Sequence, residues 1–189
     1  MKHAEAFELI KKTYPVLNRI ALEEFLEFSS LIERPKKAIL ISEGKKHSYF
    51  YYPIQGATKS YYLKKGEKVC NWFTFESEMI GNLKAYKGEP SNETIELLEN
   101  SVLIRLDTQK LQSLSKNNLI ISEFLHEVIL EHAIFLEERL FQLQFMSSKE
   151  RHQNLLKEEP LLYQRVTIND IASYLGISRE TLSRIRAQR

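Results

Sequence analysis

The sequence has few of the cysteines and histidines with which proteins hold transition metals, iron–sulfur clusters or a covalent cross-link. Its single cysteine, Cys70, excludes an internal disulfide and any iron–sulfur cluster or zinc finger held by cysteines. His47 is the only histidine between Lys36 and Leu106, although a cupin-type metal enzyme needs several in that part of the chain. We therefore expect no metal and no cofactor.

Signals of secretion, membrane insertion and catalysis are also missing. The start, MKHAEAFELIKK, carries charge throughout, and no apolar run is long enough to span a membrane. The sequence contains no G-x-S-x-G, P-loop or H-E-x-x-H motif. These absences predict a cytoplasmic protein that contacts no membrane and is not an enzyme.

The charge is nearly balanced, with 27 Lys and Arg against 25 Asp and Glu. A chain that coats nucleic acid non-specifically carries a larger positive excess than the formal +2 of this sequence. Any affinity for nucleic acid must therefore come from a local group of basic residues. Four arginines lie between Arg179 and Arg189, at the end of the sequence.

Aromatic and β-branched residues gather between Lys36 and Leu106, where glycines separate short segments. This composition predicts antiparallel strands. A hairpin turn between two of them is predicted at Lys64-Lys65-Gly66-Glu67. Six strands favour a sandwich or a small barrel. The predicted strands are Ala38–Gly44, Tyr49–Gly56, Ala57–Leu63, Lys68–Phe75, Thr94–Leu98 and Ser101–Leu106.

Helical spacing dominates on both sides of these strands. Residues 1–33 look helical, and we expect Pro15 to open or break a helix there. Residues 116–146 predict one long helix that begins near Asn117 or Asn118.

The long helix over residues 116–146 has two apolar stripes. One steps by four and three residues like a coiled-coil seam and consists of Ile129, Ala133, Leu136, Leu140 and Leu143. The other consists of Ile121, Leu125, Val128, His132 and Phe135. A helix with one stripe on the strands and one on a second copy of the chain would form a homodimer. The alternative is a helix buried on two sides within a single chain.

The stretch VTINDIASYLGISRETLSRIRAQR, from Val166 to Arg189, predicts two short helices around a tight turn. Apolar residues at helical spacing follow Thr167, which fits a capping box with Asp170 at the start of the first helix. Gly176 suits the left-handed turn that ends this helix, and Ser178 can cap the second one.

Two helices joined in this way form a helix-turn-helix, whose second helix enters the major groove of DNA. Glu180, Ser183 and Arg184 would lie on its outward face, opposite Leu182 and Ile185. Arginine can donate two hydrogen bonds to guanine, and glutamate can accept one from cytosine. One alternative is a helical hairpin with a solvated arginine face. Another is a ligand-sensing or protein-interaction module whose helix-turn-helix contacts a protein partner.

These elements predict an α+β chain of three parts. Residues 1–115 would form an effector or sensor domain built on an antiparallel β-barrel, and residues 116–146 a dimerisation helix. Residues 147–189 would form an all-α DNA-binding domain, with the boundary at Ser147-Ser148.

A β-barrel, a long helix and a helix-turn-helix in this order resemble the Crp/Fnr family of bacterial transcription regulators. The most specific stretch is ISRETLSRI, from Ile177 to Ile185, which is similar to the family's recognition helix. AILISEG followed by YFYYPIQG resembles the opening of its cyclic-nucleotide-binding jelly roll. The resemblance implies a homodimer on a pseudo-palindromic site in double-stranded DNA, with RNA polymerase as a further partner.

The resemblance also implies roles for single residues. Arg179 and Arg184 would contact guanines and Glu180 a cytosine, while Thr167 and Ser178 would hold phosphates. The full set of predicted DNA contacts is Thr167, Ser178, Arg179, Glu180, Ser183, Arg184, Arg186 and Arg189.

The sequence departs from the family at the expected ligand site. Members that bind cyclic AMP have a Gly-Glu pair for the ribose, whereas here Glu78 follows Ser77. The segment around Ser91-Asn92 lacks the arginine that meets the cyclic phosphate, so a buried phosphate would be left unpaired. We therefore expect that any effector is not cyclic AMP. Glu78, Ser91 and Asn92 are the candidate ligand-binding residues, unless they form a polar loop without a ligand.

A second departure lies at the end of the sequence. Many relatives continue past the recognition helix into a β-hairpin wing that touches the DNA backbone, and this sequence ends at Arg189. We therefore expect a short form without a wing, in which either Arg186 and Arg189 supply phosphate contacts or the affinity depends on the dimer.

Overall fold

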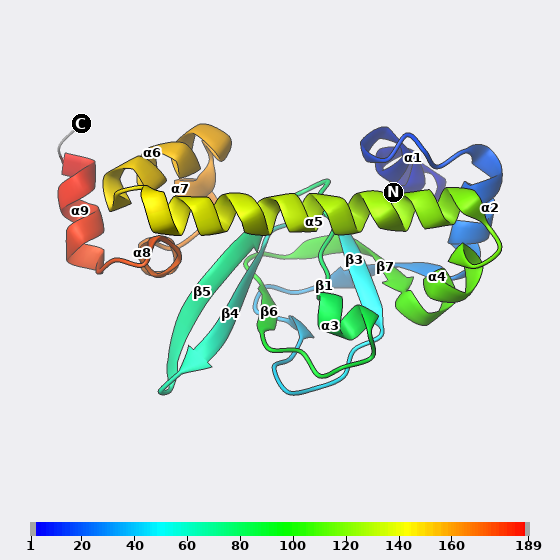
Figure 1. Cartoon of the computed structure of the whole chain (residues 1–189), viewed down its shortest axis with the longest axis horizontal. Coiled ribbons are helices and arrows are strands. Elements are labelled where there is room, and N and C mark those ends of the chain that lie inside the picture. Colours follow the sequence, from blue (N-terminus) through cyan, green and yellow to red (C-terminus); the bar gives the residue numbers. More distant parts are fainter. Residues whose placement is uncertain (1–2, 188–189) are drawn as a thin grey trace.

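The computed structural model describes residues 3–187, and the side chains of these residues except those of 3–7, 26 and 85. Helix α5 (Leu119–Phe145) runs along most of the molecule, with the N-terminal helices at one end and the C-terminal helices at the other (Figure 1). Two β-sheets lie between these ends. Within the described residues, no helix combines the length and the apolar character needed to cross a membrane. The predicted α+β class is confirmed.

The strands form two antiparallel sheets rather than one closed ring, with the orders β1-β7-β3 and β2-β6-β4-β5. Tyr51, Trp72 and Leu103 come from different strands and share one apolar cluster between the sheets. The domain is therefore a jelly-roll-like sandwich. The strands are Ser29–Arg34 (β1), Ile39–Ile41 (β2), Tyr49–Gln55 (β3), Thr58–Lys64 (β4), Glu67–Thr74 (β5), Thr94–Leu97 (β6) and Ser101–Asp107 (β7).

Strands β4 and β5 form a hairpin at the predicted turn. Lys65 and Gly66 both have positive φ, 54° and 86°, as two-residue hairpin loops require. From this turn the register runs back to the pair Thr58 and Thr74. All six predicted strands are observed, although β2 is shorter than expected.

The expectation that residues 1–33 are helical is wrong for β1. This strand pairs with β7 along its whole length, from Ser29 opposite Leu106 to Arg34 opposite Ser101. Backbone groups at the edge of β7 need partners, and only an extended neighbour supplies a full ladder of them. Long-range pairing therefore overrides the local helical spacing.

Helices α1 (His3–Thr13), α2 (Arg19–Glu27) and α4 (Thr108–Ser115) pack around the first turns of α5. Pro15 lies between α1 and α2, as expected of a helix breaker. The ring of Phe124 on α5 makes edge-to-face contacts with Tyr14 and Phe25, with centroids 5.0 and 5.3 Å apart. This apolar cluster fixes α5 to the N-terminal part of the chain.

Helix α5 begins after Asn118, whose side chain accepts hydrogen bonds from the N–H groups of Ile120 and Ile121. This confirms the predicted start. Of the two apolar stripes, the one through Leu125 and Val128 is buried against the rest of the chain.

The other stripe of α5, the coiled-coil seam, is not covered by the rest of the chain. Leu136, Leu140 and Leu143 are all exposed, and Leu140 has 55% of its surface accessible. The exposed residues Leu130, Ile134, Phe141 and Phe145 add further apolar surface outside this seam. The chain therefore covers only one of the two predicted stripes.

The C-terminal helices are α6 (Ser148–Glu158), α7 (Leu162–Arg165), α8 (Ile168–Leu175) and α9 (Arg179–Ala187). Ser147 and Glu150 form a capping box at the start of α6, with each side chain bound to the other's backbone N–H. Helix α5 therefore ends where the boundary was predicted. The division of the chain into three functional parts remains a prediction.

Candidate DNA interface and effector cavity

The helix-turn-helix owes its shape to three capping positions. Thr167 accepts a hydrogen bond from the N–H of Asp170 at the start of α8, at 3.2 Å. Gly176 ends α8 with φ of 68°, a left-handed conformation that glycine adopts without strain. Ser178 accepts from the N–H of Thr181 at 3.2 Å and so caps α9.

The predicted capping box at Thr167 is only half formed. The Thr167 hydroxyl donates to the Asp170 carboxylate at 2.7 Å, and Lys59 of β4 donates to the same side chain at 2.8 Å. Asp170 thus connects α8 to the sheet. The sequence predicted the cap at Thr167 but not this contact with Lys59.

Helix α9 presents the predicted face to solvent. Leu182 is fully buried, while Arg179, Glu180, Ser183 and Arg184 are exposed. Arg184 donates to the Thr181 hydroxyl at 3.2 Å, which holds its guanidinium close to the helix. This arrangement leaves two arginines and a glutamate on one accessible helix face.

The other predicted DNA contacts lie in different surroundings. Thr167 and Ser178 are exposed at the starts of α8 and α9. Arg186 is also exposed, but its guanidinium lies over the ring of Tyr163, 4.5 Å from the centroid, so it packs back onto α7. Arg189 lies outside the described residues.

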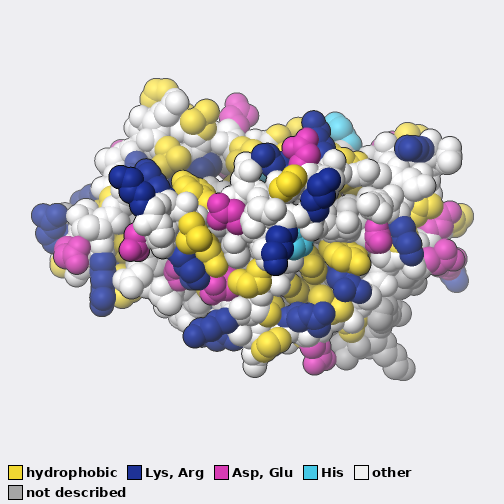
Figure 2. All heavy atoms as spheres, turned by 90° about the horizontal axis from the view of Figure 1, so that it is seen from below, with side chains coloured by type: hydrophobic (Ala, Val, Ile, Leu, Met, Phe, Trp, Pro, Cys, Tyr) yellow, Lys and Arg dark blue, Asp and Glu magenta, His cyan; other side chains and the backbone are white. Residues whose placement is uncertain are grey.

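Charge is spread over the rest of the visible surface. On the face seen from below, Figure 2 shows basic and acidic side chains interspersed, with apolar side chains between them. Such a mixture gives no broad positive field that would attract a polyanion. The described residues on the face in this view therefore offer no second basic surface for DNA.

The helix-turn-helix packs directly on the jelly roll. Leu175 and Leu182 belong to the same apolar cluster as Ala57 and Cys70 of the sheet region. The Cys70 N–H also donates to the Ser173 hydroxyl at 2.9 Å. The two parts of the chain therefore share a core.

Arg165 adds an ionic connection between the same two parts. Its guanidinium donates two hydrogen bonds to the Glu76 carboxylate, at 2.8 and 2.7 Å, and a third to Glu99. Burial opposes ionisation of Glu76, but the bonds from Arg165 and from the backbone N–H groups of Gly56 and Glu76 together outweigh it and lower the pKa of this carboxyl. These bonds bring α7 against the loops that follow β5 and β6.

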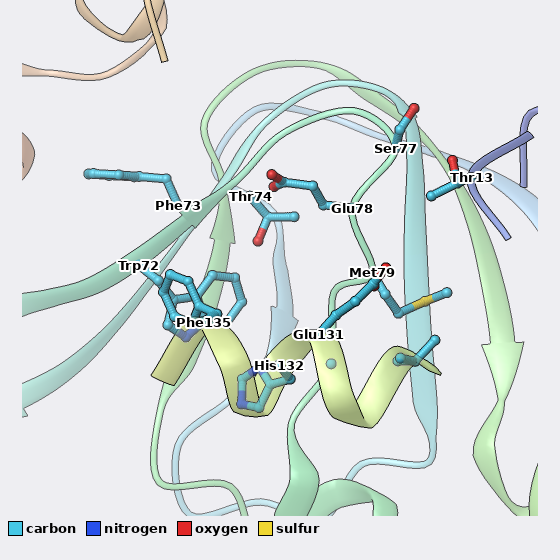
Figure 3. A pocket seen from close by; sticks show the side chains of 12 residues that line it. Thr13, Trp72, Phe73, Thr74, Ser77, Glu78, Met79, Glu131, His132 and Phe135 are labelled. Atoms are coloured by element: carbon cyan, nitrogen blue, oxygen red, sulfur yellow. The ribbon is translucent and has the colours of Figure 1, made fainter. Parts of the chain in front are cut away.

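A cavity of about 340 Å³ lies between β5, the loop after it, and α5. We call it the acidic cavity, because the carboxylates of Glu78 and Glu131 both line it. Figure 3 shows the rings of Trp72 and Phe135 side by side at one end, with His132 beside them. Glu78, a predicted ligand-binding residue, therefore lines this cavity, and its role remains a prediction.

The two other predicted ligand residues lie elsewhere. Ser91 is buried and accepts a hydrogen bond from the Glu93 N–H at 3.1 Å, while Asn92 accepts one from Lys84 at 2.9 Å. Asn92 lines a second, shallower hollow of about 330 Å³, to which Glu78 does not contribute. The structure thus separates Glu78 from the segment around Ser91-Asn92, and His132 is the one described residue that lines both spaces.

Glu93 is the buried polar residue that sequence reasoning missed. It is 8% exposed, and its carboxylate accepts hydrogen bonds from a hydroxyl, an indole and two amides. The donors are Ser60, Asn71 (3.3 Å), Trp72 (3.0 Å) and Asn82 (2.8 Å). Nothing in the local sequence distinguishes Glu93 from the other glutamates near it, because its donors come from β4, β5 and the loop before α3 (Leu83–Tyr86).

Comparisons with known proteins agree with this architecture. Residues 31–118 match the family model of the cyclic nucleotide-binding domain. FixK2 from Bradyrhizobium japonicum is 19% identical, with a TM-score of 0.74 over 85% of this chain and 83% of its own. A Crp/Fnr-family transcriptional regulator from Eubacterium rectale is 18% identical, with a TM-score of 0.72 over 91% and 83% of the two chains. The chain has the Crp/Fnr fold.

A further Crp/Fnr-like neighbour is CLP from Xanthomonas campestris, a c-di-GMP-responsive global regulator. It is 18% identical, with a TM-score of 0.71 over 90% of this chain and 91% of its own. No curated protein sequence matches the chain. The resemblance inferred from the sequence is confirmed at the level of the Crp/Fnr fold and of its cyclic nucleotide-binding domain.

Proposed function

We propose that this chain is a homodimeric DNA-binding transcription regulator of the Crp/Fnr type and not an enzyme. The observation that carries the proposal is the exposed face of α9, on which Arg179, Glu180 and Arg184 lie together. Arginine and glutamate match the donor and acceptor patterns of guanine and cytosine in the major groove. A protein that binds the bacterial chromosome works in the cytoplasm.

The uncovered seam of α5 supports the homodimer. Ala133, Leu136, Leu140 and Leu143 form an exposed stripe with the spacing of a coiled coil, and two copies of it would bury each other. A two-fold axis along this seam would present two α9 helices to DNA. Such pairs bind half-sites about 34 Å apart, one helical turn of DNA.

Sedimentation equilibrium tests the dimer with two leucines of nearly equal exposure. Leu140 on the seam is 55% exposed, and Leu63 on the β4–β5 hairpin is 54% exposed. We expect Leu140→Glu to be a monomer, while the wild type and Leu63→Glu are dimers. A dimer that survives Leu140→Glu would place the interface elsewhere.

Selection of bound duplexes from a random DNA pool tests the DNA-binding function. We expect an enriched pseudo-palindrome with half-sites one helical turn apart, and binding that weakens steeply with salt. If no sequence is enriched and heparin does not retain the protein, the helix-turn-helix contacts a protein partner instead.

A further inference from the structure

The walls of the acidic cavity carry negative charge without a cation. Of the described residues that line it, none is lysine or arginine, and two are glutamates, Glu78 and Glu131. The Glu78 carboxylate accepts one hydrogen bond from the Phe75 N–H, and the Glu131 carboxylate accepts one from the Tyr14 hydroxyl, both at 2.8 Å. Desolvation disfavours the charged forms of His132 and Glu78, so it lowers the pKa of His132 and raises the pKa of Glu78. An anion entering this cavity would therefore meet two carboxylates and no compensating charge, which is costly in a partly desolvated site.

The groups most suited to hold an anion nearby are already in use. Four neutral donors, the Trp72 indole N–H among them, converge on the buried Glu93 carboxylate. The Glu93 carboxylate thus occupies the hydrogen-bond donors that a bound phosphate would need. Lys84 is exposed and donates to Asn92 outside the acidic cavity.

The remaining surface of the cavity is aromatic and apolar. Trp72 and Phe135 present rings at one end, and Met79 and Val128 add aliphatic surface. An indole face is the best partner that a protein offers to an ammonium group or to another flat ring. At roughly 30 Å³ for each water-sized group, the volume holds about ten non-hydrogen atoms.

We propose that the acidic cavity binds a small organic cation, an amine or guanidinium group on an aromatic or apolar body. The cationic group would lie between Glu78 and Glu131, and the body against Trp72 and Phe135. The binding itself does not depend on DNA. Glu131, His132 and Phe135 lie on α5, which also carries the dimer seam, so a bound cation would act on the dimer as the effector. This role as effector rests on the proposed function.

The single tryptophan of the chain is Trp72, so tryptophan fluorescence excited beyond the tyrosine absorption band reports on one wall of the acidic cavity. We would titrate the wild type, without DNA, with phenethylamine and with its uncharged isostere 2-phenylethanol. A charged hydrogen bond contributes about 1.5–3 kcal/mol, so phenethylamine should bind about 10- to 150-fold more tightly. 3-Phenylpropionate and cyclic AMP should leave the fluorescence unchanged.

Substitutions of the two cavity glutamates test whether phenethylamine binds in the acidic cavity. Glu78→Gln and Glu131→Gln should each weaken phenethylamine at least about 10-fold, because each removes one carboxylate partner. Glu123→Gln, an exposed change on the same helix outside the cavity, should leave the affinity unchanged. Melting temperatures of the variants would establish that they are folded.

Three results would overturn the proposal. They are equal binding of phenethylamine and 2-phenylethanol, no response to either at millimolar concentration, and saturable binding of cyclic AMP. Failure to select a DNA site, with phenethylamine binding intact, would contradict the proposed function and leave the cavity assignment standing.

Discussion

The ion pair between Lys59 and Asp170 joins the jelly roll to the helix-turn-helix, and its contribution to stability follows from its surroundings. The Lys59 side chain is 11% exposed and lies 2.8 Å from Asp170 and 3.9 Å from Glu96. Breaking a largely buried pair by removing one partner costs about 3–5 kcal/mol, because the other charge stays buried.

For Lys59→Met we expect a loss at or just below the lower end of that range. Asp170 keeps the hydrogen bond from the Thr167 hydroxyl, and the methionine fills most of the lysine's volume. The expected decrease in the free energy of unfolding is therefore about 2–3 kcal/mol. It would be measured by urea denaturation followed by circular dichroism.

Lys68→Met is the matched control. Lys68 donates to the same Glu96, at 2.9 Å, from the neighbouring strand, but its side chain is 49% exposed. Such a pair contributes less than about 1 kcal/mol. Removing both charges in Lys59→Met/Asp170→Asn should recover part of the stability lost in Lys59→Met. Equal losses in Lys59→Met and Lys68→Met would refute the reasoning.

Three further predictions concern buried or paired groups. Because the pKa of Glu76 is lowered in the folded chain, its pair with Arg165 stabilises the fold at pH values above the ordinary carboxyl pKa. This stabilisation is lost as the pH falls through the lowered pKa. The urea midpoint should therefore fall more steeply between about pH 5 and about pH 3 in the wild type than in Arg165→Met, and parallel curves would contradict this. Burial raises the pKa of the Cys70 thiol to about 12, so a thiol reagent at neutral pH should label the native protein at least about 100-fold more slowly than the protein in urea. Glu93→Ala leaves several buried donors without an acceptor and should cost about 2–4 kcal/mol, and a thermal melt close to that of the wild type would argue against this.

Much of the fold could be predicted because its signals are local. The turn at Lys65-Gly66, the cap at Asn118 and the glycine turn at Gly176 each depend on a few adjacent residues. The apolar stripes of α5 follow from helical spacing alone. Such elements need no knowledge of the distant chain.

The errors and omissions all involve partners far apart in the sequence. Strand β1 forms because β7 offers it a backbone ladder, and Glu93 is buried because donors from other elements converge on it. Asp170 pairs with Lys59, which lies 111 residues earlier. For the candidate site, the outward face of α9 was predictable from spacing. The acidic cavity was not, because its walls come from elements that meet only in the folded chain.

The most direct test of the DNA-binding role compares Arg184→Ala with Arg19→Ala on a duplex selected from the random pool. Arg184 lies on the exposed face of α9, and Arg19 is an exposed arginine on α2 at the opposite end of the molecule (Figure 1). Fluorescence anisotropy should show that Arg184→Ala weakens binding by about 1–3 kcal/mol and relaxes specificity at one base step, while Arg19→Ala binds like the wild type. Unchanged affinity and specificity in a folded Arg184→Ala variant would contradict the assignment of α9 as the recognition helix.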